Sequence, residues 1–219
     1  MMANASLGVR PVRLPLGATG FARISNVSRE TLERLSNYVD LLEQWNRRIN
    51  LVGRNTMGDV WRRHILDAAQ LWPLLPARTR VLIDLGSGAG IPGLVLAAMG
   101  VPEVHLVESD QRKAAFLREA SRIMGLPVSI HPERIEKLPP FDADVVTARG
   151  LADLSELLDL AEKFLSKRTV CLFLKGKSVA VERAVASESW TMSAEEIPSR
   201  SDPNGVILKL AQVQRGTKR

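Results

Sequence analysis

The sequence has little cysteine and no long apolar run. Its one cysteine, Cys171, excludes an internal disulfide and any zinc site built from several cysteines. Because Cys171 lies within an apolar run, we expect it to pack in the core and not to act as a nucleophile. No apolar stretch reaches the roughly 18 residues that a membrane span needs. The sequence therefore predicts a cytoplasmic protein with no membrane partner.

Acidic residues are scarce in the first third of the chain. Residues 1–80 hold twelve Arg and no Lys against six acids, whereas residues 81–219 hold eighteen basic and eighteen acidic residues. The whole formal net charge of +6 therefore comes from the first third. This asymmetry predicts that this part meets a polyanion or an acidic partner, and a solvated basic surface is the alternative.

The chain divides into three parts by composition. Residues 1–24 are rich in Gly, Pro, Ala and Arg, which predicts a flexible basic arm; a transit peptide is an alternative, and no stretch there suits a secretory signal. Residues 25–78 predict a helical cap, with one helix after Ser28 and a second from about Thr56 to Trp72. Residues 79–219 form the larger predicted domain, and 219 residues with 45% apolar composition suffice for it.

Short β-rich runs alternate with helical stretches from Val81 onward. This alternation predicts an α/β fold with a mostly parallel sheet and helices on both faces, whose ligand lies at the carboxyl ends of the strands. The predicted strands cover residues 81–85, 104–108, 128–131, 144–148, 170–175 and 206–210, and the predicted helices include 111–124 and 154–165.

A glycine-rich turn between Asp84 and Leu94 is the strongest local motif. It follows an apolar strand and precedes a helical stretch, and glycines let a turn bring its main chain close to a ligand. Glu108 ends the next predicted strand, where its carboxylate can accept hydrogen bonds from both ribose hydroxyls of an adenosine. Together these features predict an adenosine-containing cofactor.

The turn favours S-adenosylmethionine over NAD. Asp84 precedes the first glycine, where we expect it to meet the cationic amino acid portion of S-adenosylmethionine. The spacing of Gly88, Gly90 and Gly93 also fits the dinucleotide fingerprint, so NAD stays open.

Several blocks of the sequence resemble one bacterial family, the glucose-inhibited division protein B family of 16S ribosomal RNA guanine-N7 methyltransferases. The blocks are Trp45-Asn46-x-x-Ile49-Asn50-Leu51-Val52, Arg63-His64-Ile65-Leu66-Asp67, the glycine turn, the stretch 107–117, Arg134-Ile135-Glu136, the stretch 145–150 and Leu174-Lys175-Gly176. The resemblance covers roughly residues 28–210. It implies a class I, S-adenosylmethionine-dependent methyltransferase (Rossmann-like) fold with an N-terminal helical cap.

The resemblance and the turn together give a set of candidate site residues. For the cofactor we expect Asp84, Gly86, Ser87, Gly88, Gly90, Ile91, Glu108, Ser109, Ile135, Glu136 and Arg149, and no metal. Near the catalytic cleft we expect Arg149, Arg134 and His64, and for RNA contacts Arg62, Arg63, His64 and Lys175. Where many family members carry an Arg, this chain has Asn204-Gly205, so a basic contact to RNA is either missing there or supplied by another residue, with Lys209 and Arg200 as candidates.

The expected reaction is methylation of guanine N7 in 16S ribosomal RNA of the small ribosomal subunit. N7 carries a free lone pair, so no general base is needed, and the sequence shows no obvious catalytic dyad. We expect a monomer. A small-molecule methyltransferase, an NAD-dependent oxidoreductase and a non-catalytic RNA-binding protein remain alternatives.

Overall fold

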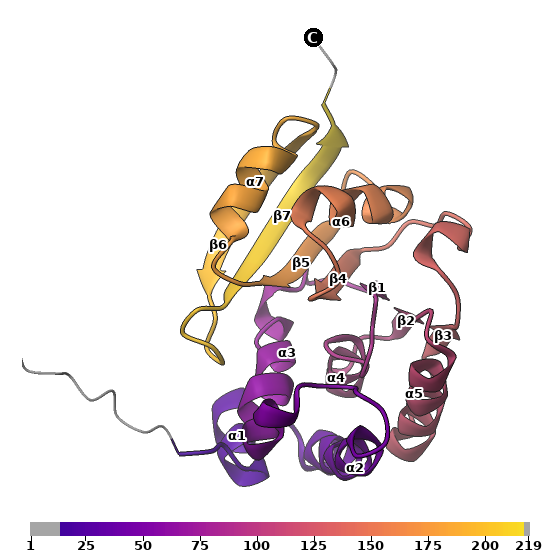
Figure 1. Ribbon diagram of the computed structural model, residues 1–219, viewed down its shortest axis with the longest axis vertical. Coiled ribbons are helices and arrows are strands. Elements are labelled where there is room, and N and C mark those ends of the chain that lie inside the picture. Colours follow the sequence, from indigo (N-terminus) through magenta and orange to yellow (C-terminus); the bar gives the residue numbers. More distant parts are fainter. Residues whose placement is uncertain (1–13, 217–219) are drawn as a thin grey trace, which may run out of the picture.

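A seven-stranded sheet forms the centre of the computed structural model, which describes residues 14–216 (Figure 1). Its strands are β1 (Val81–Leu85), β2 (Glu103–Val107), β3 (Ser129–His131), β4 (Val145–Arg149), β5 (Val170–Lys175), β6 (Trp190–Pro198) and β7 (Val206–Arg215). They are ordered β3-β2-β1-β4-β5-β7-β6. The first five pair in parallel, whereas β7 runs antiparallel to both β5 and β6. The predicted fold class is confirmed.

Helices cover both faces of this sheet. They are α1 (Ala18–Ser25), α2 (Arg29–Asn46), α3 (Asp67–Ala69), α4 (Gly93–Met99), α5 (Gln111–Met124), α6 (Leu154–Ala161) and α7 (Val179–Ala186). Shorter helical turns are η1 (Arg54–Asp59), η2 (Trp61–Leu66), η3 (Trp72–Leu74), η4 (Ile135–Lys137) and η5 (Glu162–Phe164). Polar N-caps start the longer helices: the Ser28 hydroxyl accepts the Thr31 N–H at 3.1 Å, and the Asp110 carboxylate accepts the Arg112 N–H at 2.8 Å.

Alternate residues of the central strands pack into two separate cores. Leu82 and Leu106 belong to the core under α2, α4 and α5, whereas Ile83 and Val107 belong to the core under α6 and α7. Figure 1 shows these two helix groups on opposite sides of the sheet. Parallel strands that are buried on both faces consist of nearly continuous apolar residues. This pattern made the central strands predictable from the sequence.

The prediction that the N-terminal arm is flexible is wrong for residues 18–24. Residues 18–24, predicted to be loose, lie in α1, and Phe21 is fully buried against Trp61 with ring centroids 5.4 Å apart. An eight-residue helix is too short to show a repeated apolar period, so the pattern was missed. Residues 1–13 of the arm lie outside the described residues, and the proposed division at residue 78 stays a prediction.

Two further segments differ from the expectation. The helix predicted over residues 56–72 is broken into η1, a π-helical turn η2, and the short α3. The edge strand β6 was not predicted, because the consecutive exposed residues Glu195 and Glu196 interrupt its alternation of polar and apolar residues and have low strand propensity. Trp190 starts this strand and is buried.

Among residues 14–216, no helix is long and apolar enough to cross a membrane.

Candidate functional site

A cavity of about 450 Å³ lies at the carboxyl edge of β1, β2 and β4. In the strand order, β1 and β4 are the neighbours at which the chain changes direction across the sheet, and ligands of open α/β sheets bind at this point. Of the predicted site residues, the cavity is lined by Gly86, Ser87, Gly88, Ile91, Glu108, Ser109, Arg134, Ile135, Glu136 and Arg149.

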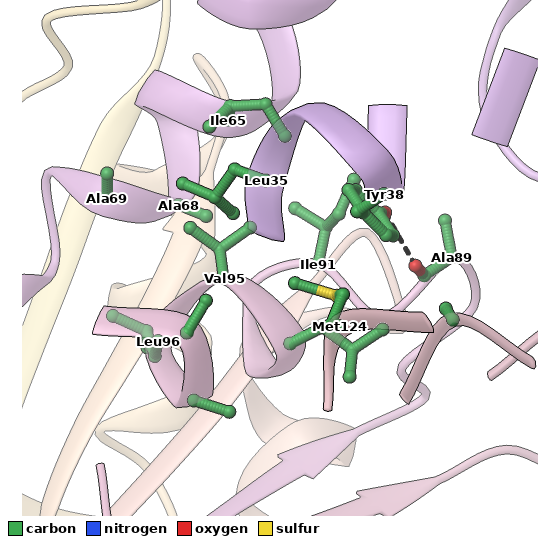
Figure 2. Packing of buried hydrophobic residues seen from close by; sticks show 14 of the residues in the cluster. Leu35, Tyr38, Ile65, Ala68, Ala69, Ala89, Ile91, Val95, Leu96 and Met124 are labelled. Carbon is green, nitrogen blue, oxygen red and sulfur yellow. Dashed lines mark hydrogen bonds between the residues drawn. The ribbon is translucent and has the colours of Figure 1, made fainter. Parts of the chain in front are cut away.

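The glycine turn forms one wall of the cavity. Gly86 has a φ of +64°, which favours glycine, and a Cβ there would lie 2.6 Å from the side chain of Leu151, which would have to move. The Ser87 N–H donates to the Val107 carbonyl at 2.9 Å, which fixes the turn to the end of β2. From the other side, the Tyr38 hydroxyl of α2 donates to the Ala89 carbonyl at 2.7 Å (Figure 2). The turn is therefore held in place by two distant elements.

Asp84 does not line the cavity, contrary to the sequence-based expectation. Its carboxyl group is fully buried and accepts hydrogen bonds from the Thr147 hydroxyl at 2.8 Å and the Gly93 N–H at 3.2 Å. Burial raises the pKa of Asp84 to about 6, although these hydrogen bonds oppose the rise. The side chain joins β1, β4 and the start of α4, so its placement opposes contact with a bound cofactor.

Gly90 is likewise absent from the cavity wall. A Cβ at this residue would lie 2.5 Å from the side chain of Leu94 and 2.9 Å from that of Leu117. With a φ of +81°, Gly90 also has a backbone conformation that favours glycine, so close packing and backbone geometry both account for the residue type.

Glu108 closes the cavity on the β2 side. Its Oε2 accepts the Gly88 N–H at 2.9 Å and its Oε1 accepts the Asp110 N–H at 2.8 Å. The residue is only 8% exposed. Because a carboxylate offers about four lone-pair positions, both oxygens keep the capacity to accept further hydrogen bonds.

Arg149, at the end of β4, is held by a group of residues from the helical segment at 63–67. Its Nη1 donates to Nδ1 of His64 at 2.9 Å and lies 3.4 Å from Oδ2 of Asp67. The Arg63 carbonyl lies 3.5 Å from the same nitrogen. Within the described residues, no hydrogen bond is recorded for Nε or Nη2 of Arg149.

Both ring nitrogens of His64 are committed to hydrogen bonds. The Thr56 hydroxyl donates to the Gly53 carbonyl at 2.6 Å, so its oxygen accepts from Nε2–H of His64 at 2.7 Å. Nδ1 is then the acceptor from Arg149. Burial, with the charges of Arg149 and Arg63, lowers the pKa of His64 to about 3, so the imidazole is neutral near pH 7. His64 is thus built to orient Arg149 and has no free nitrogen for proton transfer.

The residues expected to contact RNA are mostly occupied within the protein. Arg62 bonds Asp59 at 2.9 Å and the Leu14 carbonyl at 2.9 Å. Lys175 pairs with Glu182 at 2.6 Å and its side chain is only 9% exposed. These two placements oppose the predicted phosphate contacts, because a cation already paired and buried has little to gain from a phosphate.

Other arginines of the first third are exposed on the surface of the protein. Arg47, Arg48 and Arg54 have no ion pair recorded within residues 14–216. The side chain of Asn46 accepts the N–H groups of Leu51 and Val52 at 2.9 and 3.0 Å, which fixes this loop. Leu51 lines the cavity, and the three arginines lie within four residues of it in the sequence. The charge asymmetry of the sequence predicted such residues without identifying them.

The two candidates for the missing arginine have different surroundings. Lys209 pairs with Glu195 at 3.2 Å on the exposed side of the sheet. Arg200 is exposed in the loop between β6 and β7, and no ion pair is recorded for it among the described residues. Arg200 is therefore the better placed of the two.

Sequence reasoning missed several residues of the cavity wall. They are Leu51, Ala89, Val107, Lys113, Glu133, Gly150, Leu151, Glu156 and Leu160. Gly150 and Leu151 directly follow β4, and this position was a usable indication, since ligands lie beyond the ends of such strands. The three-dimensional approach of α6 was not readable from the sequence. The structure shows no group of three or more His, Cys, Asp or Glu placed to hold a metal within residues 14–216.

The fold is similar to those of solved methyltransferases. A ribosomal protein L11 methylase from Lactobacillus delbrueckii subsp. bulgaricus matches with a TM-score of 0.56 and 16% identity, over 66% of this chain and 76% of that one. An S-adenosylmethionine-dependent methyltransferase from Aquifex aeolicus matches with a TM-score of 0.56 and 13% identity, over 69% and 92%. With the strand order and the glycine turn, these likenesses define a class I methyltransferase fold.

The sequence comparisons identify the family. Residues 31–203 match the family model described as GidB, rRNA small subunit methyltransferase G. A ribosomal RNA small subunit methyltransferase G from Rhodospirillum centenum is 58% identical over 196 residues, covering 90% of this chain and 91% of its own. One from Rhodospirillum rubrum is 57% identical over 195 residues, covering 89% and 97%. The chain belongs to the GidB family, as the resemblance in the sequence indicated.

Proposed function

We propose that this chain is an S-adenosylmethionine-dependent methyltransferase that modifies N7 of a guanine in 16S ribosomal RNA of the small ribosomal subunit. The observation that carries this proposal is the cavity between the glycine turn and Glu108, in a chain of the GidB family. A monomeric state and a cytoplasmic location stay predictions.

The cavity has the chemistry that S-adenosylmethionine requires. The turn of Gly86 and Gly88 offers close main-chain approach, and Glu108 retains lone pairs for the ribose hydroxyls. Glu133, Glu136 and Glu156 also line the cavity. These three carboxylates, and not Asp84, are placed to balance the positive charge of the methyl donor.

The reaction needs alignment more than proton transfer. Bound S-adenosylmethionine supplies an electrophilic methyl group. The lone pair of guanine N7 forms the new bond to the methyl carbon while the carbon–sulfur bond breaks, and its electron pair stays on sulfur. No proton moves, which agrees with a site whose histidine has no free nitrogen. Arg149, held by His64, orients the reactants, and such alignment is worth up to about 7–11 kcal/mol.

The exposed arginines supply the contacts to RNA. Arg47, Arg48 and Arg54 flank the loop that ends at Leu51 on the cavity wall, and Arg134 lies exposed on another side of the cavity. Phosphate contacts from these residues position the RNA without reading its sequence. The target base lies in an unpaired loop or is flipped out, because a stacked base cannot reach the cavity.

Methyl incorporation tests the proposed reaction. We expect the protein to transfer a radiolabelled methyl group from S-adenosylmethionine to small subunits that lack this modification, and nuclease digestion with mass spectrometry to identify 7-methylguanosine. Large-subunit RNA is the matched control. A protein that binds the methyl donor but labels no ribosomal RNA would contradict the proposal and favour a small-molecule substrate.

Replacing Arg47 and Arg48 together tests the RNA surface. Log affinity falls with log salt concentration, and each phosphate contact on single-stranded RNA contributes about −0.7 to that slope. The double alanine variant should therefore have a slope that is shallower by about 1.4. Fluorescence anisotropy with labelled small-subunit RNA over a salt series measures the slope. Arg34→Ala is the control, because Arg34 lies on α2, which ends directly before Arg47, but it pairs with Glu30 at 2.8 Å. An unchanged slope in the double variant would remove these residues from the RNA surface.

A further inference from the structure

A second cavity of about 250 Å³ adjoins the first one. Arg149 and Gly150 line both cavities, so the two cavities lie next to each other at the end of β4. The remaining wall comes from the helical segment 63–67, the end of β5, and the loop between β6 and β7. It consists of Arg63, His64, Asp67, Leu174, Lys175, Ser199, Ser201, Asp202, Gly205 and Val206.

The loop between β6 and β7 is fastened rigidly to the helical segment beneath it. The buried Gln70 donates to the Ser199 hydroxyl at 3.0 Å and accepts the Arg200 N–H at 2.7 Å. The Ser201 hydroxyl donates to Asp67. These contacts join residues about 130 positions apart in the sequence and hold the cavity open in a defined shape.

The charges around this cavity are balanced within the protein. Arg63 pairs with Asp202 at 2.8 Å, and Lys175 pairs with Glu182 at 2.6 Å. Arg149 lies 3.4 Å from Asp67. A phosphate would meet the two aspartates as well as the cations, so the cavity suits a neutral polar group instead.

The hydrogen-bonding groups that remain match guanine and not adenine. Nε and Nη2 of Arg149 are donors with no partner recorded among residues 14–216, and guanine O6 is an acceptor where adenine carries an amino donor. The Asp202 carboxylate accepts one hydrogen bond from the Asn204 N–H at 2.9 Å and pairs with Arg63, which leaves lone pairs open. The adjacent N1–H and N2–H groups of guanine are donors that a carboxylate accepts.

The carboxylates of Asp202 and Asp67 also favour the methylated product of the reaction. Methylation at N7 moves the positive charge from sulfur to the purine ring. Asp202 and Asp67 lie in the cavity that would hold this ring, where negative charge stabilises the cationic purine as it develops.

We propose that this second cavity is the binding site of the target guanine, with Asp202 accepting hydrogen bonds from its N1–H and N2–H edge and Arg149 donating to O6. This proposal rests on the proposed function. N7, which neighbours O6, then faces the cavity of the methyl donor across Arg149 and Gly150.

The test combines a protein variant with a change of base. In Asp202→Asn the side chain keeps its shape and its contact with Arg63, but it loses the carboxylate. We expect kcat/KM for methyl transfer to unmethylated small subunits to fall by about ten- to a hundredfold. The affinity for S-adenosylhomocysteine, measured by calorimetry, should stay unchanged. Glu195→Gln is the control, because Glu195 is an exposed acid on β6 outside the cavity.

Inosine at the target position, introduced by ligation of a synthetic oligonucleotide, lacks the N2 amino group. It should slow the wild type by about tenfold and the Asp202→Asn variant by little, because the partner of that group is already gone. Equal sensitivity of both proteins to inosine, or an unchanged kcat/KM in the variant, would overturn the proposal. A higher kcat/KM with a steeper salt slope would also overturn it, and would indicate a phosphate site.

A second variant covers the case in which Asp202→Asn does not fold. Val206→Phe fills the same cavity from β7, and we expect it to lose methyl transfer by at least tenfold while it binds S-adenosylhomocysteine normally. Wild-type activity in this variant would contradict the base pocket. If the wild type itself labels no RNA, the proposed function fails instead, so the two failures are distinguishable.

Discussion

Arg149→Ala is expected to lower kcat for methyl transfer by about a hundred- to a thousandfold, with a much smaller loss of folding stability. The guanidinium lines both cavities, and three groups of the segment 63–67 surround its Nη1. Without this guanidinium, the methyl donor and the target guanine are no longer oriented by a common residue. A misplacement of the reacting groups by about 1 Å lowers the rate on the order of a hundredfold. Single-turnover methylation of unmethylated small subunits measures the effect, and urea unfolding measures the stability.

The control for this variant is Arg122→Ala. Arg122 is an exposed arginine of α5 that pairs with Glu119 at 2.7 Å, so its loss should leave the rate unchanged. Arg149→Lys keeps the charge but not the planar group of donors, and it should recover only a small part of the activity. A loss of activity in Arg149→Ala that parallels its thermal destabilisation would show that the residue is structural.

Glu108→Ala is expected to weaken binding of S-adenosylhomocysteine by about ten- to a hundredfold. Its carboxylate holds the Gly88 N–H at 2.9 Å and offers lone pairs for the ribose hydroxyls. A hydrogen bond to a charged group contributes about 1.5–3 kcal/mol, and each 1.4 kcal/mol is a factor of ten in affinity. Isothermal titration calorimetry measures the dissociation constant directly.

Two further variants separate ligand contact from support of the turn. Glu108→Gln keeps an oxygen for the Gly88 N–H, so it should bind better than the alanine variant if the turn is the main effect. Glu103→Ala removes an exposed acid from β2, the strand that ends directly before Glu108, and should bind normally. Unchanged affinity in Glu108→Ala would exclude the ribose contact, and tighter binding of NAD than of S-adenosylhomocysteine would overturn the assignment of the cofactor.

The glycine turn and Glu108 were predictable because their constraints are local. A sharp turn needs glycine at a positive φ, and the end of a buried strand places the next side chain at the ligand edge. Asp84 shows the limit of this reasoning. The sequence places it beside the turn, but only packing decides that its carboxyl group faces Thr147 and the start of α4.

The RNA-contact residues show the same limit. Arg63 and Lys175 look as available in the sequence as Arg47 and Arg48 do. Asp202, the partner of Arg63, lies far away in the sequence, and Glu182, the partner of Lys175, comes close only because α7 folds back toward the end of β5. The net charge of the first third therefore predicts only the sign of the charge on a partner, while the structure was needed to identify the exposed arginines with no ion pair among residues 14–216.

The sequence by itself determined the fold class, the glycine turn and the family, because strand and helix periodicity, the steric needs of glycine and contiguous motifs are properties of short segments. The tertiary structure alone decided that Arg149 is held by His64 and that a second cavity opens beside the first. Both depend on segments about 85 to 130 residues apart in the chain. Contacts of that range arise only when the core packs, and hydrogen-bond partners and cavities follow from that packing.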